Sequence, residues 1–133
     1  MRKIIFIFSV LLLSFSFIQC NSKEKALNKK LEEMAANLNE SAPVMLDQYT
    51  RFEEASVVQG NIFRYRYTVL NTSNADSLVE HGLQSLKENI GKEFSSNPDL
   101  RIFKENNVTM EYVYNDETGR IIRSLQIGPQ DYQ

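Results

Sequence analysis

The chain contains 133 residues, of which 42% are hydrophobic, and its 15 basic and 17 acidic side chains give a net charge of −2. With one histidine and one cysteine, the sequence lacks the clustered Cys and His ligands of transition-metal sites, and we expect neither a metal nor a cofactor. A negative net charge also disfavours nucleic acid as a partner, because neutralisation of phosphates supplies most of that affinity.

The first twenty residues have the order of a bacterial export signal. Arg2 and Lys3 precede an apolar run over residues 4–18, which ends just before Cys20. The run of 15 residues is shorter than the roughly 20 needed to cross a bilayer. The segment resembles a lipoprotein signal, in which the cysteine is acylated and becomes the first mature residue. We therefore expect lipidation of Cys20; cleavage without a lipid, or an uncleaved anchor, are the alternatives.

The remainder of the chain fits one small domain. Without residues 1–20 it has 13 basic and 17 acidic side chains, a net charge of −4, and no cysteine after Cys20. We expect a polar tether over residues 21–25 and a single domain over residues 26–133, which is long enough to bury about two-thirds of its unfolded surface.

The periodicity of hydrophobic residues predicts helices and strands in this domain. Apolar residues three or four positions apart predict two helices, over residues 25–38 and 75–94. Alternation predicts strands over residues 63–69, 108–114 and 120–127, and the irregular segment 44–58 is also strand-like.

Turn signals join these segments. Gln59-Gly60-Asn61 favours a hairpin turn, and Asn97-Pro98-Asp99 is typical of a helix start, with a cap residue followed by proline. Because isolated hairpins need a partner layer, the α-β-β-α-β-β order predicts an α+β two-layer sandwich, with a four-stranded antiparallel sheet and the helices packed on one face.

Four short motifs are spread over the mature domain. They are Pro43-x-Met45-x-Asp47 with Thr50-Arg51, Tyr65-x-Tyr67 running to Asn71, Asn97-Pro98-Asp99-Leu100, and Tyr112-x-Tyr114 followed by Asp116 and Gly119. Together they resemble a family of small exported bacterial proteins with no established function, and the resemblance implies export and this fold.

That family also has two cysteines, one just before the Asn-Pro-Asp segment and one at the C-terminus, which the resemblance implies to be disulfide-bonded. This chain has Ser95 or Ser96 at the first place and Tyr132 or Gln133 at the second. It therefore lacks a covalent link typically worth about 2–4 kcal/mol.

The titratable residues do not form a recognisable catalytic pattern. His81 lies on the polar side of the second predicted helix, so no Ser/His/Asp or Cys/His set can be built, and we expect a solvated histidine. Asp47 and Arg51 are four residues apart in an extended segment and would point to the same side. Either they form an exposed ion pair, or they mark a contact site with Glu53 beside them.

Four tyrosines repeat a two-residue spacing in two predicted strands: Tyr65 and Tyr67, and Tyr112 and Tyr114. They could form one stripe on the sheet. That stripe would either pack as core beneath the helices or lie open as a binding platform, since tyrosine combines an apolar ring with a polar hydroxyl.

The sequence therefore favours a non-enzymatic lipoprotein of the bacterial envelope, attached to a membrane through Cys20 and acting as a binding or accessory module for a protein partner. One alternative is a periplasmic small-ligand binder or weak hydrolase with its site near Asp47 and Arg51. A purely structural envelope protein is the other.

Overall fold

The structure, a computed structural model, describes residues 22–59 and 61–132. The expected export signal and Cys20 lie outside these residues. The chain divides into two compact units, residues 1–30 and 31–133. In the first unit, residues 22–30 are helical, so residues 22–25, expected to belong to a tether, already form helix. The same helix continues to residue 39 in the second unit.

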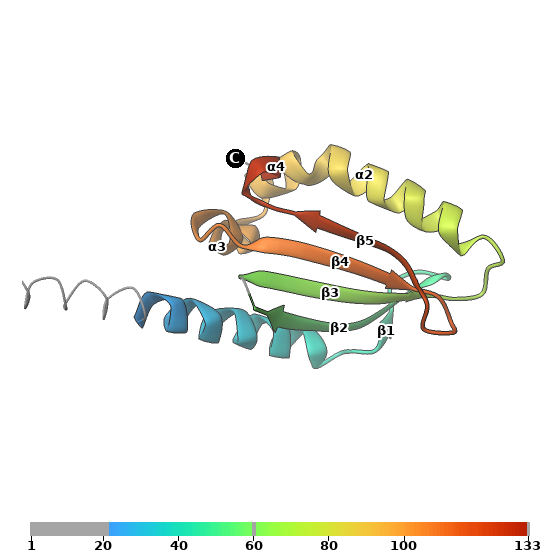
Figure 1. The fold of residues 1–133 in the computed structure, drawn as a ribbon, viewed down its shortest axis with the longest axis horizontal. Helices are drawn as coiled ribbons and strands as arrows, with labels where there is room; N and C mark the ends of the chain where they lie inside the picture. Colours follow the sequence, from blue (N-terminus) through green and yellow to red (C-terminus); the bar gives the residue numbers. More distant parts are fainter. Residues whose placement is uncertain (1–21, 60, 133) are drawn as a thin grey trace, which may run out of the picture. The chain divides into compact units, whose positions relative to one another are not determined.

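The second unit contains a five-stranded mixed sheet with helices packed on it (Figure 1). The strands follow the order β1-β2-β3-β4-β5. Their bounds are Val44–Met45 for β1, Thr50–Val58 for β2, Ile62–Val69 for β3, Thr109–Asn115 for β4 and Ile121–Ile127 for β5. All neighbouring strands are antiparallel except β3 and β4, which are parallel.

The α+β class is therefore confirmed, whereas the four-stranded antiparallel sheet is wrong in two respects. The helical segment between β3 and β4 is a crossover, which returns the chain beside β3 in the same direction. The fifth strand is β1, a two-residue edge strand whose Val44 and Met45 pair with Phe52 and Arg51 of β2. A strand this short gives no periodic signal in the sequence.

A bulge in β2 explains the broken alternation of residues 44–58. Phe52 pairs with Tyr67 and Glu54 pairs with Arg66, so Glu53 is the extra residue. The bulge allows Phe52 and Ala55, three residues apart, both to be buried, with exposed fractions of 7% and 3%.

The crossover consists of α2, Ala75–Ser96, a 3₁₀ turn, Pro98–Leu100, and α3, Arg101–Glu105. The buried residues of α2 are Val79, Leu83, Ile90 and Phe94, as the helical spacing predicts. Asn97 caps the 3₁₀ turn by accepting a hydrogen bond from the Asp99 backbone N–H at 3.0 Å, which confirms the predicted helix start.

The side chains of Asn39 and Tyr132, near the two ends of the second unit, attach the adjoining segments to the rest of that unit. The side-chain amide of Asn39 accepts from Ala55 N at 2.7 Å and donates to Ala55 O at 2.9 Å. These two bonds pair backbone groups of β2 that lie beyond Arg51 and Phe52, the residues paired with β1. At the other end, α4 (Pro129–Tyr132) brings the buried ring of Tyr132 onto Phe94, with centroids 4.3 Å apart.

The two faces of the sheet differ in chemistry because side chains alternate along each strand. One face carries the tyrosine pairs, and α2 packs on it through a cluster of Val69, Val79, Leu83 and Ile122. The opposite face carries charged residues joined in ion pairs, which are Arg51–Glu53, Arg64–Glu111 and Arg66–Glu54. Within the described ranges, none of the helices is long and apolar enough to span a bilayer.

A candidate binding groove on the tyrosine face

The four tyrosines lie side by side at the centre of the sheet. The parallel register places Tyr65 opposite Tyr112 and Tyr67 opposite Tyr114. Both pairs are stacked, with ring centroids 5.1 Å and 4.8 Å apart and interplanar angles of 16° and 18°. The predicted stripe is therefore present. All four side chains are half-buried, so the stripe is neither fully buried core nor a fully open platform, the two alternatives that the sequence allowed.

Burial keeps these hydroxyls protonated. It raises the pKa of Tyr65 to about 12, and burial together with the neighbouring tyrosines raises the pKa of Tyr67 further. The pKa values of Tyr112 and Tyr114 are also raised, again mainly by burial. At neutral pH the stripe thus offers uncharged hydroxyls that can donate or accept a hydrogen bond.

A groove of about 270 Å³ opens over one end of this stripe. Tyr67 and Tyr114 line it from the sheet, and the remaining lining residues come from β3, α2 and the segment around the start of β2: Val69, Leu78, Val79, Gly82, Leu46, Asp47 and Thr50. Leu46 and Leu78 leave 59% and 40% of their surface exposed. An open groove whose rim exposes apolar side chains to solvent is typical of an interaction site.

Asp47 shapes the loop on one side of the groove. Its Oδ1 accepts hydrogen bonds from the backbone N–H groups of Tyr49 and Thr50, at 2.7 Å and 2.8 Å. The bond from Tyr49 is the main cause of a lowered pKa for the Asp47 carboxyl, so the group is ionised at neutral pH. This turn holds Leu46 at the groove, and it places a negative charge beside Tyr114.

Arg51 and Glu53 lie on the opposite, charged face. Arg51 pairs in register with Thr68, which alternates with Tyr67, and its Nε donates to Glu53 at 2.7 Å. Burial raises the pKa of Glu53, but hydrogen bonds from Thr68 and Arg51 outweigh it and the net shift is downward. Among the described residues, the ion pair of Arg51 is with Glu53, whereas Asp47 lies in the turn before β2 and accepts from the backbone of that turn.

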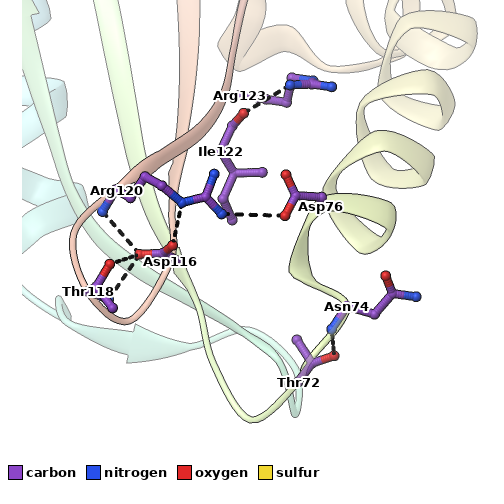
Figure 2. A network of polar contacts seen from close by, with 8 residues as sticks. All are labelled: Thr72, Asn74, Asp76, Asp116, Thr118, Arg120, Ile122 and Arg123. Carbon is purple, nitrogen blue, oxygen red and sulfur yellow. Dashed lines mark hydrogen bonds and ion pairs between the residues drawn. The ribbon is translucent and has the colours of Figure 1, made fainter.

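A polar network fixes the N-terminal end of α2, which carries the groove wall (Figure 2). Asp116, in the β4–β5 turn, accepts hydrogen bonds from Thr118 and from both the backbone and the side chain of Arg120. These bonds, led by the Thr118 hydroxyl, lower the Asp116 pKa to about 2. Arg120 also reaches Asp76 in the first turn of α2 at 3.4 Å. The β4–β5 turn is thus joined to the first turn of α2 by an exposed ion pair.

The groove was only partly predictable. The sequence indicated Tyr67, Tyr114 and Asp47, but not Leu46, Leu78 or Gly82. One available signal was the run Val44-Met45-Leu46, three consecutive apolar residues, and all three are exposed.

The remaining candidates do not enlarge the site. His81 is exposed, and its Nδ1 lies 2.8 Å from Ser77 O on its own helix. Among residues 22–59 and 61–132, no cluster of three His, Cys, Asp or Glu side chains is placed to hold a metal ion.

The fold and the groove define a small α+β domain that presents a half-open sheet surface beside a helix. The chain belongs to the family described as Domain of unknown function (DUF8479), whose profile matches residues 25–122. Among curated proteins, none matches this chain.

Three solved structures share the fold at low sequence identity. The secreted protein PA3611 of Pseudomonas aeruginosa has a TM-score of 0.67 at 18% identity, over 82% of this chain and 95% of that protein. EpsS, a type 2 secretion system pilotin from Vibrio vulnificus, has a TM-score of 0.63 at 15% identity, over 85% and 97%. The type II secretion system pilotin AspS from Vibrio cholerae has a TM-score of 0.59 at 15% identity, over 84% and 97%. At these identities the similarity establishes the fold alone.

Proposed function

We propose that this protein is a non-enzymatic binding module of the bacterial envelope, held at a membrane by acylated Cys20, and that its groove holds a segment of a protein partner. Residues 1–20 are the export signal in this proposal. The domain after it faces the periplasm or the exterior.

The observation that carries the proposal is the combination of chemistries in the groove. Its rims carry the exposed Leu46 and Leu78, and it is lined from the sheet by Tyr67 and Tyr114, whose raised pKa values keep their hydroxyls uncharged. Apolar side chains of a partner would bury against Leu46 and Leu78, while its backbone or polar groups would bond the hydroxyls. Tyrosine is enriched at protein interfaces for this reason.

A polypeptide fits this surface better than a small ligand. Small-molecule sites are clefts or cavities of about 300–1,000 Å³ that bury most of the ligand's surface. Here the volume is about 270 Å³, and exposed apolar surface continues outside the groove onto Val44 and Met45, with exposed fractions of 36% and 45%. The small-ligand or hydrolase alternative, with a site near Asp47 and Arg51, is less favoured, because Asp47 lines the groove whereas Arg51 is not among its lining residues and pairs with Glu53.

The comparisons support an accessory role. Two of the similar structures are named pilotins of type 2 secretion systems. We carry over only the class of role, a small envelope protein that acts on another protein, because the identities are 15%.

The test is to fill the groove without disturbing the fold. Gly82 lines the groove on α2, and a Cβ added there meets no atom within 4 Å. We therefore expect Gly82→Leu to fold normally, since leucine is a better helix former than glycine, and to abolish crosslinking of the partner in intact envelopes.

Gly91 provides the matched control. It lies on the same helix, an added Cβ there also meets nothing within 4 Å, and it is not among the residues that line the groove. The Gly91→Leu variant should capture the same partner as the wild type, identified by mass. Equal capture by Gly82→Leu would place the partner elsewhere and refute the groove as its site.

A further inference from the structure

The start of the first helix carries a concentrated positive charge. Residues 22–30 contain Lys23, Lys25, Lys29 and Lys30 against one acidic residue, Glu24, a net charge of +3. The chain from residue 31 onwards has 9 basic and 16 acidic residues, a net charge of −7. The nine-residue segment is therefore opposite in sign to the rest of the mature protein.

The helix gathers these lysines on one side. At about 100° per residue they fall within an arc of roughly 160°, while Glu24 and the partly buried Leu27 lie outside that arc. All four lysines are exposed, whereas Leu31 is 1% exposed. We call these four residues the lysine face.

The lysine face begins close to the expected anchor. Ser22, where the described helix begins, is two residues beyond Cys20, a reach of at most about 7 Å. Lys30 is eight residues further along the helix, about 12 Å. An acylated Cys20 would thus hold Lys23 close to the lipid headgroups, and Lys30 could reach them when the helix lies along the surface.

We propose that the lysine face binds the anionic phospholipid headgroups of the membrane that holds this protein. The proposal rests on the proposed function in one respect, the anchor at Cys20. Basic residues next to an anchor are attracted to anionic lipid within about a Debye length, roughly 8 Å at physiological salt. Lys23 and Lys25 can reach the headgroups at any angle between the helix and the membrane. Lys29 and Lys30 reach them only if the helix lies along the membrane surface with the lysine face toward it. Binding by the lysine face therefore predicts that all four lysines are protected on anionic vesicles.

The experiment compares lysine reactivity on two kinds of vesicle. The protein is purified from envelopes as the cell processes it and reconstituted into vesicles of phosphatidylcholine, with or without phosphatidylglycerol. Acetylation of each lysine by a water-soluble reagent is then followed by mass spectrometry. We expect the lysine face to react at least about threefold more slowly on anionic vesicles at low salt, and the difference to vanish at high salt.

Internal controls come from the same molecule. Lys87, Lys92 and Lys104 are exposed and lie outside the segment, so their rates should not depend on the lipid. Equal rates for the lysine face on both vesicles would overturn the proposal, as would slowing of Lys23 and Lys25 alone or of all seven lysines together. Recovery of the protein free of vesicles would count against the Cys20 anchor, and hence against this proposal, without touching the groove.

Discussion

Tyr132 should contribute measurable stability through its hydroxyl alone. The side chain is 5% exposed, and its hydroxyl lies 2.8 Å from Val108 O and 3.2 Å from Phe103 O. Phe103 O also accepts from Val108 N at 2.9 Å, so it keeps a partner without the hydroxyl. In Tyr132→Phe, the Val108 carbonyl loses its bond to this hydroxyl, while the ring still stacks on Phe94.

The expected loss is about 1–3 kcal/mol, the cost of leaving a buried carbonyl without this partner. For a domain of this size, about 1 kcal/mol shifts the melting temperature by about 4–8 °C. We therefore expect Tyr132→Phe to melt roughly 5–15 °C below the wild type when unfolding is followed by circular dichroism.

Tyr112→Phe is the matched control, because in the part of the chain that the structure describes the Tyr112 hydroxyl bonds the Met110 sulfur at 3.7 Å, a weak acceptor. Its stability should stay within about 0.5 kcal/mol of the wild type. The prediction would be refuted if the two variants had the same melting temperature, or if Tyr132→Phe had the melting temperature of the wild type. In either case the Tyr132 hydroxyl would not stabilise the C-terminal segment.

Three further outcomes follow from the described contacts. Gly82→Ala and Gly91→Ala should each raise the free energy of unfolding by up to about 1 kcal/mol in urea titrations, because added methyl groups meet nothing within 4 Å; a loss would show hidden crowding. The folded pKa of Asp116, lowered to about 2, gives stability that is present above its unfolded pKa and lost as pH falls from 4 to 2, so Asp116→Asn should flatten that loss. Burial raises the pKa of Tyr65 to about 12, so its contribution is present below pH 10 and lost between pH 10 and 12. Tyr65→Phe should therefore be less sensitive to alkali than the wild type, and an equal sensitivity would contradict the assignment.

Local patterns predicted the elements better than their arrangement. The spacing of Val79, Leu83, Ile90 and Phe94 gave the buried side of α2, because one helix face meets the core every three or four residues. The parallel pairing of β3 with β4 was not predictable in this way. It depends on the path of the crossover between them, and no local pattern in either strand records its neighbour.

The candidate site shows the same division. Alternation predicted that Tyr65 and Tyr67 share a face, and the same for Tyr112 and Tyr114. That the two pairs stack on each other follows from the register, in which Tyr65 lies opposite Tyr112. The exposure of Leu46 and Leu78 depends on where α2 crosses the sheet, which only the folded chain shows.

The family cysteines illustrate how one contact can replace another. The resemblance implies a disulfide between the segment at Ser95 or Ser96 and the C-terminus. In this chain Phe94 and Tyr132 join the same two segments by stacked rings 4.3 Å apart. A noncovalent contact of this kind does not depend on the redox state of the compartment.

The pairing of β3 with β4 also sets the order in which a binding surface can appear. Tyr67 and Tyr114 are 47 residues apart in sequence, and α2 lies between them. In the proposed function the chain is exported and would emerge from the membrane progressively, so Tyr67 would appear well before Tyr114. Because the groove is complete only after β4 has docked beside β3, a protein with the proposed function would become able to bind its partner only near the end of its translocation.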